Sequence, residues 1–137
     1  MIYIDTSLVI SFIDERDSNH SRALDIIERM GSEERAVSSL VLLELSSVYS
    51  RADLDRPLEL ALYSIESVRA RIFDLRFDHV MRIAFRTAPE LKLRTLDLLH
   101  VSACRSIGAD KFVTLDGDII NKRDLIRDRL GITVISP

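Results

Sequence analysis

The stretch MIYIDTS, residues 1–7, is an apolar run that ends in a single carboxylate. Residues 2–4 have the β-branched and aromatic character of a short buried strand, and Asp5 opens a cap-like Asp-Thr-Ser sequence before an apolar helix predicted over residues 8–13. A strand is therefore expected to end at Asp5. Ligands and catalytic groups collect at the carboxyl ends of strands in open α/β sheets, so this acid is a candidate for chemistry.

Short apolar strands alternate with helices along the rest of the chain. Further strands are predicted over residues 35–38, 72–75, 111–115 and 132–135. Helices are predicted between a polar cap at 17–19 and Gly31, and over residues 40–51, 57–71, 78–88, 96–107 and 118–130, with Pro89 closing the fourth of these six. The strands lack a clean period-two alternation, which is typical of strands buried on both faces. The pattern predicts a three-layer α/β/α sandwich around a five-stranded parallel sheet.

Length and composition indicate one globular domain over residues 1–137, with 47% apolar and 30% charged residues. The single cysteine, Cys104, excludes an intramolecular disulfide and a cysteine-based zinc site, so a reducing, cytoplasmic setting is expected. No uncharged stretch is long enough to cross a bilayer, so no membrane partner is expected. The net charge of −3 excludes the overall positive charge that is typical of general nucleic-acid-binding proteins, so any nucleic-acid contact must be local.

Three further acids stand in apolar surroundings as Asp5 does. Glu44 and Asp97 are each the only charged residue in a long apolar stretch, and Asp116 follows an apolar strand. Clustered buried carboxylates raise one another's pKa and oppose ionisation, so a positive charge should compensate them. No Lys or Arg is expected beside Asp5, Glu44 or Asp97 in the first helical turn. A divalent cation is therefore predicted, and carboxylate oxygens are the ligands that Mg²⁺ and Mn²⁺ prefer.

Structural roles compete with this interpretation for three of the acids. Asp5 could cap a helix, Asp116 could be a turn residue before Gly117, and Asp97 suits the positive end of a helix dipole. Glu44 is harder to explain in this way, because a mid-helix acid has neither a cap nor a dipole to favour it.

Two more residues have open assignments. Asp118 could join the acids, but it is favoured as the cap of the helix predicted over residues 118–130. His100 lies one helical turn after Asp97 and could face the same cleft, although a lone histidine on an apolar helix is more often a hydrogen-bonded core residue.

Four segments resemble the PIN-domain nucleases, and most closely the VapC-type toxins of prokaryotic toxin–antitoxin pairs. They are YIDTS, LLELSSVY, LRTLDLLHVSAC and FVTLDGD, which occur in the family's order along the full chain. The resemblance implies the family's five-stranded parallel sheet and an acidic quartet that binds the metal, formed by Asp5, Glu44, Asp97 and Asp116, with Glu44 acting directly or through water. It also implies supporting roles for Thr6, Ser7 and Thr114.

The resemblance further implies a Mg²⁺- or Mn²⁺-dependent ribonuclease that acts on RNA, forms a homodimer and is held inactive by a small antitoxin inserted into the active-site groove. The apolar part of that groove is expected beside the helices predicted over residues 40–51 and 57–71, at Leu45, Val48, Tyr49, Leu60 and Tyr63.

Three other functions remain open. They are a PIN-type RNA-processing nuclease without an antitoxin, a catalytically silent relative that binds RNA or protein, and an aspartate-based phosphotransfer protein. The last is disfavoured because Ser7 stands where a related phosphatase has a second aspartate, and because Lys111 begins its strand instead of following it.

Overall fold

A computed structural model describes all 137 residues and contains one five-stranded sheet in the order β3-β2-β1-β4-β5. The strands are β1 (Ile2–Ile4), β2 (Arg35–Ser38), β3 (Arg71–Phe73), β4 (Lys111–Val113) and β5 (Thr133–Ile135). All four neighbouring pairs are parallel, and Ile2 of the central strand lies opposite Arg35 and Lys111. The predicted parallel sheet is confirmed.

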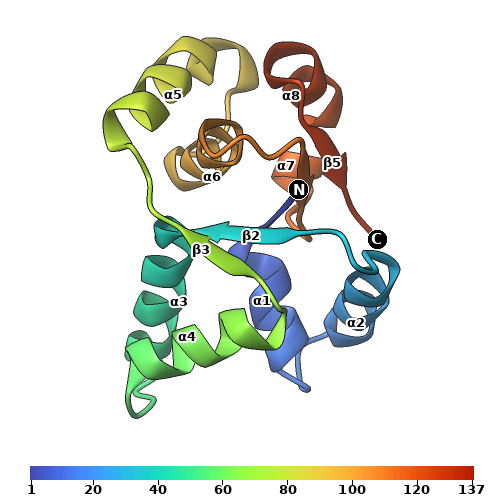
Figure 1. Ribbon diagram of the computed structural model, residues 1–137, viewed down its shortest axis with the longest axis vertical. Coiled ribbons are helices and arrows are strands. Elements are labelled where there is room, and N and C mark those ends of the chain that lie inside the picture. The colour runs from blue at the N-terminus through green and yellow to red at the C-terminus, as the bar shows by residue number, and fades with distance from the viewer.

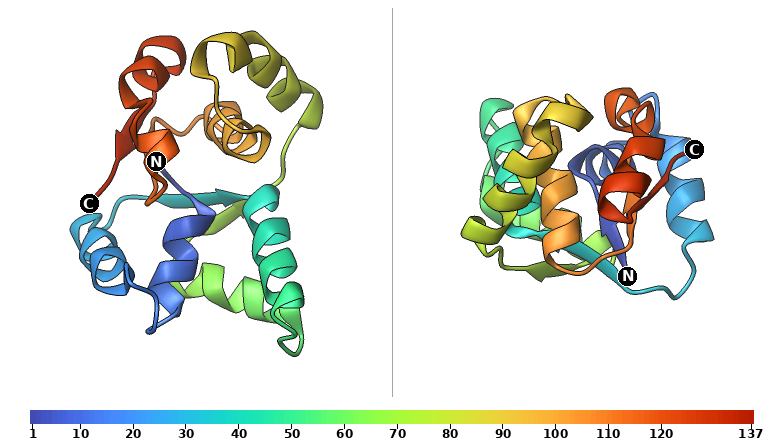
Figure 2. Two further views of the ribbon diagram at one scale, coloured as in Figure 1. Left: turned by 180° about the vertical axis from the view of Figure 1, so that it is seen from behind. Right: turned by 90° about the horizontal axis from the view of Figure 1, so that it is seen from above.

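Eight helices cover the sheet. They are α1 (Thr6–Ile13), α2 (His20–Arg29), α3 (Ser39–Arg51), α4 (Pro57–Ser67), α5 (Phe77–Leu91), α6 (Thr95–Ser106), α7 (Gly117–Ile120) and α8 (Arg123–Leu130). Figures 1 and 2 show α1–α4 on one face of the sheet and α5–α8 on the other, which confirms the three-layer sandwich. None of these helices combines the length and the apolar character needed to cross a membrane.

Three predicted helix ends are wrong, each for a local reason. Helix α5 continues through Pro89, because a proline in the last turn removes only one hydrogen bond from the helix. Helix α4 ends at Ser67, just before Arg69 adopts the left-handed conformation with φ 54°. The helix predicted over residues 118–130 is two helices, because Lys122 leaves the helical region with φ −101° and ψ 9°.

The core brings the carboxyl ends of the middle strands to one edge of the sheet. A cluster of 27 buried apolar residues spans both faces, and Tyr3 of β1 stacks on Phe112 of β4 with ring centroids 5.3 Å apart. Because the strands are parallel, the residues that end or follow β1, β2 and β4 meet at the same edge. These residues are Asp5, Ser38 and Thr114, and all three are buried.

Candidate active site

Asp5 lies at the centre of this edge and is held by three donors. Its Oδ1 accepts a hydrogen bond from the Thr6 backbone N–H at 2.9 Å, and its Oδ2 accepts from the Ser7 and Thr114 hydroxyls at 2.8 and 2.7 Å. Burial raises the pKa of the Asp5 carboxyl, while the nearby His100 and the two hydroxyls partly offset this rise. The structure thus places Ser7 and Thr114 against the acid, whereas Thr6 contacts it only through its backbone.

Asp97, Asp116 and Asp118 form a second group of carboxylates, here called the acid trio. One oxygen of each lies within 4.8 Å of the others. Oδ2 of Asp97 is buried and accepts no hydrogen bond. Burial raises the pKa of Asp97, and the negative charges of Asp116 and Asp5 raise it further. Hard divalent cations bind carboxylate oxygens, so a carboxylate oxygen without a hydrogen bond in a cluster of acids is suited to such an ion.

The structure corrects the predicted role of Asp118. Asp116 is the N-cap of α7 and accepts a hydrogen bond from the Asp118 N–H at 2.8 Å. Asp118 is therefore not a cap, and its carboxylate belongs to the acid trio. The helical roles considered for Asp5 and Asp97 are also present, because Asp5 caps α1 and Asp97 lies in the first turn of α6. Asp116, considered as a turn residue, is the N-cap of α7. Helix capping and a place at the site are compatible.

The expectation that no basic residue stands beside Asp97 is wrong. Arg94, the residue before α6, places Nε 3.7 Å from Asp97 Oδ2 and Nη2 3.3 Å from Asp118 Oδ2. The i,i+3 spacing of Arg94 and Asp97 is a signal that sequence reasoning could have used. The Arg94 side chain is 77% exposed, so solvent screens its charge and it neutralises the acid trio only weakly.

Glu44 is not unpaired either, and it lies outside the acid trio. Its Oε2 accepts a hydrogen bond from Nε2 of His100 at 2.6 Å. Its charge nevertheless raises the pKa of Asp5, so the two carboxylates lie close enough to interact. His100 is buried and its Nδ1 lies 3.0 Å from the Tyr3 hydroxyl. Sequence reasoning missed Tyr3, because an aromatic residue in a buried strand gives no signal of a polar contact.

An apolar groove of about 570 Å³ lies between α1, α3 and α4. Its apolar lining is Ile10, Ile13, Val48, Tyr49, Ala52, Leu54 and Leu60. Of the residues expected there, Leu45 is fully buried, Tyr49 is only 7% exposed and Tyr63 lies outside the groove. The Tyr49 hydroxyl lies 2.8 Å from the Ser64 hydroxyl, so its polar end is occupied inside the protein. We call this hollow the α1–α3–α4 groove.

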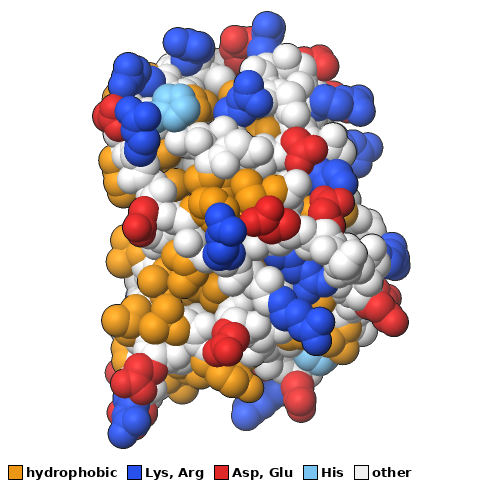
Figure 3. All heavy atoms as spheres, viewed as in Figure 1, with side chains coloured by type: hydrophobic (Ala, Val, Ile, Leu, Met, Phe, Trp, Pro, Cys, Tyr) orange, Lys and Arg blue, Asp and Glu red, His pale blue; other side chains and the backbone are white.

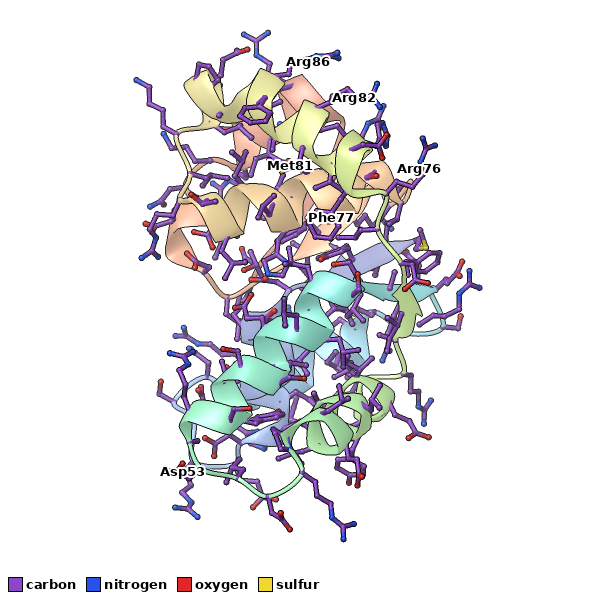
Figure 4. The ribbon with its side chains drawn as sticks, turned by 90° about the vertical axis from the view of Figure 1, so that its left-hand side faces the viewer. Asp53, Arg76, Phe77, Met81, Arg82 and Arg86 are labelled. Atoms are coloured by element: carbon purple, nitrogen blue, oxygen red, sulfur yellow. The ribbon has the colours of Figure 1, made fainter.

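A second apolar surface follows one edge of the molecule (Figure 3). On α5 it contains Phe77, Met81 and Phe85, which are 57%, 38% and 73% exposed and which we call the α5 stripe. Figure 4 shows this edge, with Phe77 and Met81 on α5 near Arg82 and Arg86. The stripe repeats every four residues, so it forms a continuous ridge along the helix.

Comparisons with known proteins agree with this geometry. The sequence model of the PIN domain matches residues 2–125. A search of curated proteins finds no significant match.

Several solved structures share the fold. VapBC2 from Rickettsia felis, bound to a DNA fragment from its promoter, is 20% identical with a TM-score of 0.66, over 100% of this chain and 99% of its own. VapC20 from Mycobacterium tuberculosis, described as a sarcin-ricin loop cleaving toxin, is 19% identical with a TM-score of 0.69, over 88% and 94% of the two chains. VapBC-1 from nontypeable Haemophilus influenzae is 19% identical with a TM-score of 0.68, over 99% and 98%.

Proposed function

Because the chain belongs to the PIN-domain family, we propose that it is a Mg²⁺- or Mn²⁺-dependent ribonuclease and the toxin of a toxin–antitoxin pair. The observation that carries the proposal is the buried Asp97 Oδ2, which accepts no hydrogen bond and has only the exposed Arg94 nearby at 3.7 Å, in a side chain that lies beside the carboxylates of Asp116 and Asp118. Structural neighbours described as VapBC complexes and as a cleaving toxin support it.

The acid trio would hold the divalent ion, with Asp5 beside it. When bound, the ion would supply the positive charge that stabilises a phosphodiester transition state. Asp5 can contribute because a carboxylate oxygen that accepts one hydrogen bond keeps a further lone pair. Its three donors fix its orientation, and they maintain a negative charge that burial alone would oppose.

Glu44 would act on the attacking water, and Arg94 would act on the reacting phosphate. Because Oε2 of Glu44 is bonded to His100, Oε1 is the oxygen that remains to accept a proton from an attacking water. Arg94 is exposed beside the acid trio, so its guanidinium can contact a phosphate once a metal ion neutralises Asp97 and Asp118.

The antitoxin would cover both the acids and the α1–α3–α4 groove. An arginine side chain could pair with the carboxylates in place of the metal, and an apolar segment could fill the groove. The two surfaces are linked, because α1 begins at the residue after Asp5 and α3 carries Glu44. We assign the antitoxin to this face because it joins an acidic site to the apolar hollow.

We also propose a homodimer that pairs the α5 stripes of two copies. In an antiparallel pair centred on Met81, Phe77 of one copy lies near Phe85 of the other. Asp78 and Arg82, on the flank of the stripe, already pair with each other at 2.8 Å within one copy. This face is therefore complementary to itself through its apolar side chains.

Cleavage assays with purified protein and mixed cellular RNA test the nuclease. We expect cleavage with Mg²⁺ or Mn²⁺, none in chelator, and a loss of at least about 100-fold for Asp97→Asn, because a carboxylate ligand is removed. Asp124→Asn is the control, since that side chain is 81% exposed on α8. Cleavage that persists in chelator, or that survives Asp97→Asn at the rate of the control, would contradict the proposed function.

A further inference from the structure

We propose that His100 is the positioning residue for Glu44. Tyr3 and Ser38 fix the imidazole of His100 in the tautomer that carries its proton on Nε2, and this tautomer can donate to Glu44. The inference deepens the proposed nuclease function, on which it rests. It assigns a role to a buried histidine that the metal-binding acids do not require.

Four side chains from four elements form one hydrogen-bonded chain. The Ser38 hydroxyl at the end of β2 lies 2.7 Å from the Tyr3 hydroxyl of β1, which lies 3.0 Å from Nδ1 of His100 on α6. Nε2 of His100 then lies 2.6 Å from Oε2 of Glu44 on α3. Ser38 and Tyr3 are fully buried and His100 is 2% exposed, so water cannot replace the Ser38–Tyr3 and Tyr3–His100 contacts.

The direction of the protons follows from what each group can donate. A carboxylate oxygen only accepts, so Nε2 of His100 carries the hydrogen that Glu44 receives. With that single proton on the ring, Nδ1 is an acceptor, and the Tyr3 hydroxyl is the donor within reach. The phenol carries one proton and donates it across the 3.0 Å contact to Nδ1. Its oxygen in turn accepts from Ser38, and every proton in the chain points toward Glu44.

The opposite tautomer is disfavoured by the same geometry. A proton on Nδ1 would place the lone pair of Nε2 against the carboxylate at 2.6 Å. The Tyr3 hydroxyl would then have to turn toward Ser38. Tyr3 therefore keeps the His100 proton on Nε2, and this N–H donates the hydrogen bond to Glu44.

This bond decides which Glu44 oxygen serves the site. A free glutamate side chain rotates about three bonds, and either oxygen could face the cleft. With Oε2 held by His100, Oε1 is the oxygen presented to the substrate. Helix α6 carries both Asp97 and His100 one turn apart, so a single rigid element places one residue in the acid trio and the other against Glu44.

Two substitutions of His100 separate positioning from packing. In His100→Gln the amide nitrogen can reach the place of Nε2 and still donate to Glu44, whereas in His100→Asn the amide ends near the place of Nδ1. Removing an orienting partner of this kind typically reduces activity about 10- to 100-fold. We expect His100→Asn to lower kcat by that amount, His100→Gln to lower it several-fold less, and KM for RNA to change little in either.

The proposal is overturned if the two variants lose the same activity at equal folded fractions, since a structural histidine would not distinguish them. A double mutant provides a second test of the proposal. His100→Asn added to Glu44→Gln should cause almost no further loss, because the pair acts as one unit. Fully additive losses contradict the proposal.

Nitrogen NMR of the histidine rings in metal-free protein provides a readout that does not depend on activity. Long-range proton–nitrogen correlations should show His100 with its proton on Nε2, and that proton signal should move upfield in Glu44→Gln. A proton on Nδ1, whether the ring carries one proton or two, overturns the inference. If wild-type protein fails to cleave RNA but shows the Nε2–H ring, the proposed function fails while the assignment of His100 stands.

Discussion

Single residues at the candidate site are held by hydrogen bonds, and Thr114 is the clearest case. Its hydroxyl donates to Asp5 and accepts from the Asp116 N–H at 2.9 Å, so it joins two of the four predicted acids. Thr114→Val keeps the shape and removes both bonds. We expect the free energy of unfolding to fall by about 1 to 3 kcal/mol, because Asp5 loses a buried partner, and cleavage to fall at least about 10-fold.

Thr87→Val is the matched control for Thr114→Val. Thr87 is equally a buried threonine, but its hydroxyl bonds only to the Ile83 carbonyl of its own helix. Chemical denaturation and RNA cleavage of both variants provide the measurement. Equal losses of activity in Thr114→Val and Thr87→Val would show that the Asp5 contact has no special role.

The raised pKa of Asp97 gives a pH-dependent prediction in chelator. A carboxyl whose folded pKa lies above its unfolded value binds more protons when folded, so it reduces stability as pH rises from the unfolded pKa through the folded pKa. Asp97→Asn removes this loss of stability. We expect the variant to be as stable as wild type at pH 7 or more stable, by about 1 kcal/mol, with the advantage disappearing below the ordinary carboxyl range.

Thermal unfolding with chelator and with excess Mg²⁺ measures both parts of the Asp97 prediction. Mg²⁺ should raise the melting temperature of wild type more than that of Asp97→Asn, because an ion that binds only the folded protein stabilises it in proportion to its affinity. A destabilised Asp97→Asn in chelator, with the same Mg²⁺ response as wild type, would make Asp97 a structural residue.

At the level of the elements, order and type could be predicted because apolar runs and caps are local signals. All five strands and the layer arrangement follow from them, and the ends that failed depend on Lys122, Arg69 and Pro89. Contacts between side chains of different elements could not be predicted from these local signals. The contact of Glu44 with His100 joins positions 56 residues apart, and only packing brings α3 and α6 together.

The α1–α3–α4 groove gives a prediction for the antitoxin. The product of a short reading frame beside the gene, if co-expressed, should bind the protein and block RNA cleavage. Val48→Asp should weaken this binding, because it places a charge in an apolar groove, and Glu44→Gln should weaken it by removing a carboxylate. Leu24→Asp, on the exposed face of α2, is the control for co-purification. Binding that survives both site variants places the partner elsewhere.

For the whole molecule, the α5 stripe predicts how two copies assemble. Three large apolar side chains repeat every four residues on the surface of one helix, and pairing them with a second copy would remove them from water. Along the adjacent flank, Asp78 is already paired with Arg82 of the same helix at 2.8 Å. The apolar contact of the stripe would therefore be what joins the two copies.

Met81→Lys tests this assembly, because in the proposed pair Met81 would lie nearest the two-fold axis and the substitution would bring two like charges together in an apolar contact. We expect wild type to show the mass of a dimer by light scattering and Met81→Lys that of a folded monomer. Leu24→Lys, which adds the same charge at a 43% exposed leucine on α2, should remain a dimer. A dimer that persists in Met81→Lys, or one lost equally in Leu24→Lys, would show that the α5 stripe does not join the two copies.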